Sequence, residues 1–289
     1  IICSDTDFED VHKPINTLES LSKVSMKNSS VFMSLDQMTW GITPTIFQYN
    51  TLPSWGKAKT SIIHDGINTN WACPGKAKGL KLYDGTIISS SDKVITFINR
   101  TYEPYRGIHV FLQSLVDVFK TDKDVKVLLV GNDTPNVSYG AARNDGQGWL
   151  SWYKQKLGNS VDWNRVYNLG LLSHDELREI YRISNVHVYL TYPFVLSWSL
   201  LEAMSCGCLV IGSDTEPVRE VIKHNENGFL VPFDNSKHLA NQIVEALNDK
   251  DHNMTIRKNA RRTIINNYNL DDCLVSQLNL INKITDFYC

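Results

Sequence analysis

The chain has 289 residues, of which 42% are hydrophobic and 21% are charged, so it is long enough to bury one large core or two modest ones. Its 29 basic and 31 acidic residues give a formal net charge of -2, which excludes recruitment of nucleic acid or anionic membrane by a global field. No apolar stretch reaches the roughly 18 residues that a membrane span needs. Any anion that binds must therefore be held by a local site.

The six cysteines are scattered, with no CxxC pair, which argues against a disulfide framework and favours a reducing cytoplasm. Cys206 and Cys208 flank a glycine at a predicted helix-to-strand turn, where we favour core packing over metal binding. The histidines show no metal-pair spacing either. We predict no metal site and assign the dispersed histidines structural roles; they include His64, His109, His174, His187 and His224.

The chain begins with IICSDTDF and no methionine, and we interpret it as a fragment that lacks its N-terminal part. Residues 1–60 contain one helical pattern at 15–26 and a second, short one at 34–41, with too few strands for an independent sheet. We predict that they are the remnant of a first domain and its linker. A strand and a turn around Asp65 and Gly66 lead into the second domain.

From about residue 92, short aliphatic runs alternate with amphipathic segments. This alternation predicts βαβ units, and so an α/β domain with a doubly wound parallel sheet. Strands are expected at 93–99, 125–131, 165–170, 186–192, 208–213 and 228–233. Helices are expected at 107–120, 175–184, 198–205, 217–224 and 237–249, followed by wholly helical patterns to the end of the chain.

Residues 132–148 form the one long segment rich in polar residues, Gly and Asn. They follow a predicted strand at the carboxyl edge of the sheet, where open α/β folds bind ligands. A mobile binding loop and a plain surface insertion are both consistent with the sequence.

Two arginines flank a predicted strand-to-helix crossover in INRTYEPYRGIHVF: Arg100 ends the strand, and Arg106 with Gly107 opens the helix. This placement predicts an anion site at the carboxyl edge of the sheet, beside the amides of the helix start. Guanidiniums hold phosphate and stay charged, so they can stabilise a leaving pyrophosphate without a metal. The alternative is that both are surface residues paired with Glu103 or Asp133.

Glu202 is the one acid embedded in a long apolar stretch, TYPFVLSWSLLEAMS. Ser197 is predicted to cap the helix that contains it, with the helix start at the same sheet edge as the arginines. A buried carboxylate needs a partner, and two ribose hydroxyls are suitable donors. A structural glutamate bonded to backbone or to an arginine is the alternative. The polar loop 213–217 lies beyond and can offer amides to a sugar or an acceptor.

Motifs of other enzyme classes are missing from the sequence. No GxGxxG follows any predicted strand, which counts against a nicotinamide dehydrogenase. GxSxG and P-loop patterns are also absent.

Five motifs in order resemble those of the retaining family 4 glycosyltransferases of GT-B architecture, which have two Rossmann-like domains. They span about 170 residues, from 62 to 231. The motifs are IIHDGIN, NRTYEPYRG, LLVG, NLGLLSHDELREIYRISNVHVYLTYPF and SLLEAMSCGCLVIGSDTEPVREVI with NGFLV. The resemblance implies an acceptor-side remnant at 1–60, a nucleotide-sugar-binding domain at 61–268 and a C-terminal helix at 269–289 that packs back on the N-terminal part.

The resemblance also implies roles by position. Arg100 and Arg106 would hold the donor diphosphate and act in catalysis, and Glu202 would bind the ribose. Further nucleotide contacts are implied for the tight strand end at Gly131, for the base pocket at Leu171, Leu172 and Ser173, and for the backbone at Val195, Leu196, Ser197 and Trp198. The nucleotide diphosphate sugar is a substrate, and neither a cofactor nor a metal is implied.

One departure concerns the paired-acid motif of the family, E-x7-E, which ends at Glu202. Its first acid, usually assigned to the donor sugar, falls at Phe194. We interpret this as a changed donor contact and not as an inactive enzyme.

The implied function is transfer of a sugar to an acceptor with retention of configuration, by front-face attack and without a protein nucleophile. The acceptor is an unknown glycan, lipid or small molecule; nucleic acid is excluded, and peripheral membrane association would run through the missing domain. A non-catalytic nucleotide-sugar or glycan-binding module is the alternative, and a fragment can bind donor while failing to transfer. An epimerase on this fold would need acid and base side chains that we do not identify.

Overall fold

The computed structural model describes residues 18–89, 91–140 and 142–288. The chain divides into two compact units, one running up to Gly66 and resuming at Leu270, the other covering Ile67–Asn269. The domain limits given above stay predictions. The first 17 residues of the predicted remnant, including the start of its first helical pattern, lie outside the described residues.

In the first unit, a single helix, α1 (Leu18–Gln37), takes the place of the two helical patterns expected at 15–26 and 34–41. The two-helix prediction was wrong because no Gly or Pro interrupts the segment between them. The helix is followed by a parallel strand pair, β1 (Gly41–Thr43) with β2 (Thr60–Ile62). The remaining elements of this unit are α2 (Ile46–Asn50), α3 (Ser54–Lys57) and α11 (Leu270–Tyr288).

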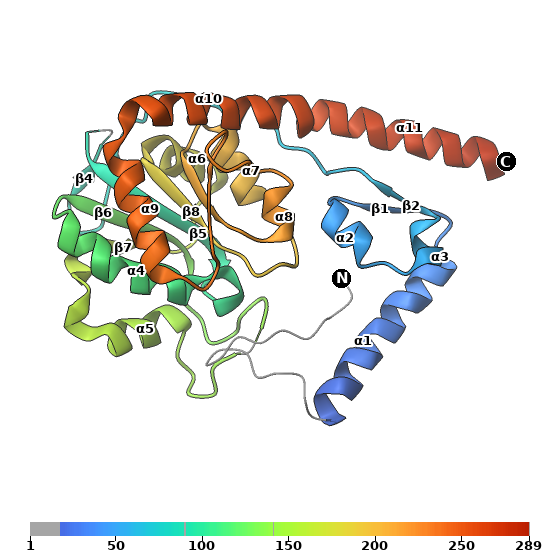
Figure 1. Ribbon diagram of the computed structural model, residues 1–289, viewed down its shortest axis with the longest axis horizontal. Coiled ribbons are helices and arrows are strands. Elements are labelled where there is room, and N and C mark those ends of the chain that lie inside the picture. Colours follow the sequence, from blue (N-terminus) through green and yellow to red (C-terminus); the bar gives the residue numbers. More distant parts are fainter. Residues whose placement is uncertain (1–17, 90, 141, 289) are drawn as a thin grey trace. The chain divides into compact units, whose positions relative to one another are not determined.

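A six-stranded parallel sheet forms the centre of the second unit, with the order β10-β9-β8-β5-β6-β7 (Figure 1). All six predicted strands are confirmed: β5 (Lys93–Thr101), β6 (Val125–Asn132), β7 (Val166–Asn168), β8 (Val186–Tyr189), β9 (Val210–Ser213) and β10 (Phe229–Val231). The chain builds outward from β5 in one direction to β7 and then in the other, from β8 to β10. Neighbouring strands β5 and β8 therefore mark the topological switch point, where doubly wound sheets bind ligands.

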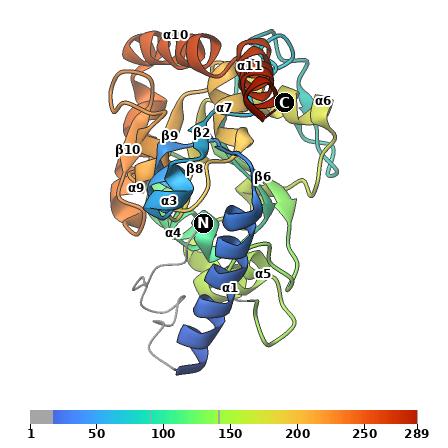
Figure 2. The same ribbon diagram turned by 90° about the vertical axis from the view of Figure 1, so that its right-hand side faces the viewer.

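Helices pack on the sheet and on one another: α4 lies against α5 and α9, and α7 lies against α10 (Figures 1 and 2). Their bounds are α4 (Ile108–Thr121), α5 (Trp149–Leu157), α6 (His174–Ile183), α7 (Trp198–Ser205), α8 (Glu216–Arg219), α9 (Ser236–Asn248) and α10 (Lys250–Asn267). Short 3₁₀ turns are η1 (Pro104–Arg106), η2 (Gly158–Ser160) and η3 (Trp163–Arg165), and a small hairpin joins β3 (Leu80–Lys81) to β4 (Ile87–Ile88).

The helix expected at 217–224 is shorter than predicted, since α8 ends at Arg219. The side chain of Asn227 accounts for the early end. Its Nδ2 donates to the carbonyl oxygen of Val221, and its Oδ1 accepts from the N–H of Lys223. These bonds offer the backbone an alternative to the helical ladder.

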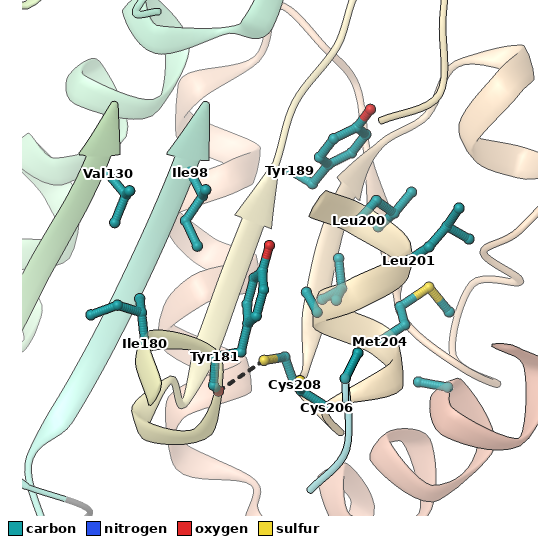
Figure 3. Close-up of a cluster of buried hydrophobic side chains, with 14 of the residues drawn as sticks. Ile98, Val130, Ile180, Tyr181, Tyr189, Leu200, Leu201, Met204, Cys206 and Cys208 are labelled. Atoms are coloured by element: carbon teal, nitrogen blue, oxygen red, sulfur yellow. Dashed lines mark hydrogen bonds between the residues drawn. The ribbon is translucent and has the colours of Figure 1, made fainter. Parts of the chain in front are cut away.

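The core beneath the switch point joins β5, β6 and β8 to α6 and α7 (Figure 3). Tyr181, Leu200 and Met204 are almost fully buried there. The thiol of Cys208 donates to the carbonyl oxygen of Tyr181 at 3.0 Å, and both Cys206 and Cys208 lie in the core, as core packing requires. This packing fixes the start of α7 relative to the ends of the strands.

Candidate functional site

A cavity of about 410 Å³ opens at the carboxyl ends of β5 and β8, at the topological switch point. Three separate segments build its wall: the end of β5 with η1, the loop after β6, and the residues leading into α7. The lining residues are Ile98, Asn99, Arg100, Thr101, Glu103, Arg106, Ser138, Tyr139, Val195, Leu196, Ser197, Trp198 and Ser199. Six of the predicted site residues thus meet at one cavity, namely both arginines and residues 195–198.

Arg106 is a buried cation that lies close enough to the buried carboxylate of Glu103 for their charges to interact, but the two form no direct ion pair. Its Nη1 donates to the hydroxyls of Tyr189, at 3.3 Å, and Thr191, at 3.2 Å, and it forms no ion pair with any carboxylate that the structure describes. The alternative of a surface residue paired with Glu103 or Asp133 was wrong for Arg106. Because a buried guanidinium is stabilised by direct pairing and Arg106 has none among the described residues, the cavity beside it is suited to an anion.

The backbone turn at Gly107 places Arg106. The arginine ends η1 and does not open the long helix as predicted, since α4 begins at Ile108. Gly107 adopts φ 71°, and a Cβ there would lie 2.4 Å from Cβ of Leu190. Only glycine allows this close approach of η1 to the end of β8.

Phe194 supports the same guanidinium. The Cζ atom of Arg106 lies 4.7 Å from the ring centre of Phe194 and 5.4 Å from that of Tyr139, and the two rings pack edge to face at 4.7 Å. Such cation–π contacts favour a charged guanidinium over an aromatic face. Phe194 is buried and is not among the lining residues, so it contributes packing to the site where the family motif has an acid.

Arg100 lines the cavity with an exposed side chain that makes no hydrogen bond or ion pair to the described residues. Asp133, its other suggested partner, instead caps α5 by accepting from the N–H groups of Leu150 and Ser151. Arg100 is thus a surface residue, as the alternative to an anion site proposed, but it has no ion-pair partner among the described residues.

Glu103 is the most buried acid of the site, at 1% exposure against 8% for Glu202. The expectation that Glu202 is the one embedded acid was wrong, because Glu103 stands in a polar stretch of sequence and is buried only by the fold. Burial raises the pKa of Glu103, and hydrogen bonds from Tyr139 and Thr101 and the charge of Arg106 act in the opposite direction. A residue that is buried only by the fold cannot be recognised from hydrophobic patterns in the sequence.

The loop 132–148 reaches the cavity through Ser138 and Tyr139. Both residues donate their backbone N–H to Oε2 of Glu103, at 2.8 and 3.0 Å. Of the two interpretations of this loop, a plain surface insertion does not account for its place in the wall. Residue 141 lies outside the described residues.

The start of α7 and Arg106 share a hydrogen-bond partner, the hydroxyl of Tyr189. Ser197 caps the helix as predicted, accepting from the N–H of Ser199, and its own N–H donates to the hydroxyl of Tyr189 at 2.9 Å. The N–H groups of Val195 and Leu196 have no acceptor among the described residues, and both residues line the cavity. They are the amides of this segment that remain available to a ligand.

Glu202 lies outside the cavity wall, in a second group of polar residues. Its Oε1 is 3.3 Å from Nε2 of His174, and its Oε2 accepts from the hydroxyl of Tyr181 at 3.3 Å. Burial raises the pKa of Glu202, partly offset by His174 and Tyr181. His174 was predicted to have only a structural role; its ring stacks on Trp71 with centroids 3.6 Å apart. Contacts from separate segments give no local signal that could have found it.

The remaining predicted residues also lie outside the cavity wall. Gly131 donates its N–H to the carbonyl of Gly170, and a Cβ there would meet the carbonyl oxygen of Asn99 at 2.4 Å. Leu171 is exposed, Leu172 packs against the core, and Ser173 forms a capping box with Glu176 at the start of α6.

The chain belongs to the glycosyl transferases group 1, whose family model matches residues 85–263, more than half of the chain. A model of the glycosyl transferase family 4 group matches residues 3–72. The resemblance inferred from the motifs is confirmed. No helix in the described part of the chain is long and apolar enough to cross a membrane.

Two curated relatives illustrate the range of the family. The phosphatidyl-myo-inositol mannosyltransferase of Mycobacterium tuberculosis is 30% identical over 244 residues, covering 80% of this chain and 60% of that protein. The N-acetyl-alpha-D-glucosaminyl L-malate synthase of Bacillus anthracis is 26% identical over 194 residues, covering 67% of this chain and 46% of that protein. The chain therefore spans only about half of the length of these relatives.

Solved structures share the fold at low identity, which confirms the predicted GT-B class. HepE of Anabaena, in complex with UDP and glucose, matches with a TM-score of 0.74 at 18% identity, covering 92% of this chain and 68% of that one. Sucrose-phosphate synthase of Thermosynechococcus elongatus matches with a TM-score of 0.73 at 23% identity, covering 94% and 64%.

Proposed function

We propose that the chain is the donor-binding part of a retaining glycosyltransferase, which moves a sugar from a nucleoside diphosphate sugar to an acceptor hydroxyl. The observation that carries the proposal is Arg106, a buried guanidinium without a carboxylate partner among the described residues, beside a cavity at the switch point of the sheet. The buried carboxylate of Glu103 interacts with this charge without forming an ion pair, which leaves the guanidinium to pair directly with a diphosphate. Membership of the glycosyl transferases group 1 supports the same assignment.

In this proposal the cavity binds the diphosphate and the sugar. Arg106 and Arg100 offset the charge that grows on the β-phosphate as the bond to the sugar breaks, and the amides of Val195 and Leu196 donate to phosphate or sugar oxygens. The leaving phosphate accepts the proton of the acceptor hydroxyl, which attacks from the same face. Positioning and fixed charge supply the catalysis, without a nucleophile on the protein.

We assign the nucleoside to the second polar group. Glu202 would exchange its weak contacts, both 3.3 Å, for the ribose hydroxyls, and Leu171, Leu172 and Ser173 would face the base, with Gly131 near the nucleotide. UDP is the first nucleotide to test, because solved structures of the same fold contain UDP. We place the protein in the cytoplasm because the four cysteines in the described part of the chain are free thiols, and we leave the acceptor open as a glycan, lipid or small molecule.

The test is a thermal-shift screen of UDP, GDP, ADP and their sugar esters, followed by calorimetry. A ligand that binds only the folded state raises the melting temperature. Arg106→Ala should weaken the best diphosphate by about tenfold or more, since a charged hydrogen bond contributes about 1.5–3 kcal/mol. Lys258→Ala, which alters an exposed cation of α10, serves as the charge control. No binding of any nucleotide by the wild type would refute the proposal.

A second candidate function is a non-catalytic module that binds a nucleotide sugar. It is suggested by Phe194, which stands where the family motif has an acid. The two functions can be distinguished by measuring slow hydrolysis of the donor. The protein tested should be a longer version that matches the length of the relatives. A transferase should release sugar from the donor, whereas a binding module should leave the donor intact.

A further inference from the structure

The buried carboxylate of Glu103 stands at the cavity wall without a role in the function proposed above. It lies in the turn between β5 and η1, directly before η1 begins at Pro104, and is only 1% exposed. Arg106, at the other end of η1, is the cation whose charge acts on this carboxylate. An acid buried this deeply at a ligand cavity calls for a function.

The two oxygens of Glu103 have different partners. Oε2 accepts from the hydroxyl of Thr101 at 2.9 Å and from the N–H groups of Ser138 and Tyr139 at 2.8 and 3.0 Å. Oε1 makes no hydrogen bond to any residue that the structure describes. One oxygen therefore holds the loop in place, and the other is an acceptor left over beside the cavity.

Tyr139 is positioned by that carboxylate. Its backbone N–H is held by Glu103, and its ring lies against Phe194 on one side and near the guanidinium of Arg106 on another. Tyr139 as a whole is 44% exposed, and it lines the cavity. It presents a flat apolar surface next to the cation that would hold the diphosphate.

We propose that Glu103 and Tyr139 form the subsite for the donor sugar, an inference that rests on the function proposed above. Oε1 of Glu103 accepts a hydrogen bond from a sugar hydroxyl, and the ring of Tyr139 packs on the apolar C–H face of the pyranose. The acid that the family motif has at position 194 is thus supplied from the turn after β5. A carboxylate at this position repels a second carboxylate, so the subsite takes a neutral hexosyl group and discriminates against a uronic acid.

The test compares the affinities of UDP, UDP-glucose and UDP-glucuronate by calorimetry, in the wild type and in Glu103→Gln and Tyr139→Ala. If another base binds better in the nucleotide screen, the corresponding diphosphate and hexose ester replace UDP and UDP-glucose. Glutamine keeps an oxygen that can accept from the loop and removes the charge. Glu245→Gln, an exposed acid of α9, is the matched control.

Three results are expected. The wild type binds UDP-glucose at least about tenfold more tightly than UDP-glucuronate, and Glu103→Gln narrows this ratio by about tenfold, the worth of one charge-assisted hydrogen bond. Tyr139→Ala weakens UDP by no more than the two- to fivefold expected for a lost cation–π contact with Arg106, and weakens UDP-glucose about tenfold further. The control changes none of the three affinities.

Other outcomes overturn the proposal in distinguishable ways. An equal loss of UDP and UDP-glucose affinity in Glu103→Gln would show that Glu103 acts only on the loop or on Arg106. An unchanged ratio of UDP-glucose to UDP-glucuronate would remove the sugar contact. A folded wild type that binds no nucleotide would refute the proposed function together with the subsite.

Discussion

Arg106 and Ser197 donate to the same oxygen, the hydroxyl of Tyr189, at 3.3 and 2.9 Å. Tyr189 is the last residue of β8 and is buried in the core. One phenol thus joins the guanidinium of the candidate anion site to the start of α7, the helix that contains Glu202. The relative positions of a cation and a helix start, which a diphosphate would contact together, depend on this hydroxyl.

Replacing Tyr189 by Phe should therefore weaken the binding of a nucleoside diphosphate without unfolding the protein. Arg106 keeps Thr191 as an acceptor, but the N–H of Ser197 loses its partner. We expect a loss of about 1 kcal/mol in binding, or about fivefold in affinity, measured by calorimetry. Tyr83→Phe, at an exposed tyrosine, is the control. An unchanged affinity would mean that the hydroxyl does not position the site.

Phe194 offers a test of the aromatic support of Arg106. Phe194→Leu should lower diphosphate affinity by about two- to fivefold, because a cation–π contact contributes about 0.5–1 kcal/mol and the leucine still fills most of the space. Phe194→Glu places a carboxylate beside Arg106, where it competes with the ligand anion, so a larger loss is expected. Calorimetry at two salt concentrations checks both variants. If Phe194→Glu binds more tightly than the wild type, the competition argument is wrong.

The turn at Gly107 predicts a stability difference between two glycines that have nearly the same positive φ. Gly146 has φ 73° and open space around it, so Gly146→Ala should cost only the strain of a left-handed alanine, about 1–2 kcal/mol. Gly107→Ala adds a collision with Leu190 and should cost at least about 2 kcal/mol more. Urea unfolding of the two variants measures the difference, and equal losses would contradict the packing of η1 on β8.

His187 predicts a pH dependence of stability. Burial lowers its pKa from 6.5 to about 3, and its Nδ1 is 2.9 Å from the hydroxyl of Thr96. On acidification, the imidazole of His187 therefore takes up a proton at a higher pH in the unfolded chain than in the native protein. The contribution of His187 to stability is complete above pH 6.5 and is lost as the pH falls toward 3.

His187→Asn keeps an acceptor or donor for Thr96 and removes the titration. Between pH 7 and pH 4 the variant should lose about 3 kcal/mol less of its free energy of unfolding than the wild type. Urea unfolding at several pH values measures this loss. His238→Asn, at an exposed histidine, should follow the wild type. Parallel curves for His187→Asn and the wild type would show that His187 is not the group responsible.

The strands and the placement of the two arginines at one cavity could be predicted because each depends on a local pattern. Aliphatic runs gave the six strands, and the crossover between β5 and α4 gave Arg100 and Arg106 a common edge. Ser197 followed from the same reasoning at the crossover between β8 and α7, whereas Val195, Leu196 and Trp198 were implied only by the family resemblance.

The rest of the site depends on contacts between distant segments. Glu103 is buried by backbone groups 35 and 36 residues further along the chain, and His174 meets Glu202 across 28 residues. Neither contact leaves a periodicity in the sequence. The family motif located position 194, but only the fold shows that an aromatic ring there supports Arg106.

Asp133 caps α5, so the start of this helix is stabilised independently of the sequence of the loop that lines the cavity. Its carboxylate closes the loop on itself, by bonding to Leu150 and Ser151 just beyond the loop's far end. Changes in loop length before Gly148 should cost β6 and α5 little, because loop-closure entropy grows slowly with length; Gly148 itself must stay, since a Cβ there would lie 1.9 Å from the capping carboxylate. If the proposed sugar subsite is correct, related enzymes can acquire a different donor preference by replacing this loop alone, while the sheet that carries the candidate anion site stays as it is.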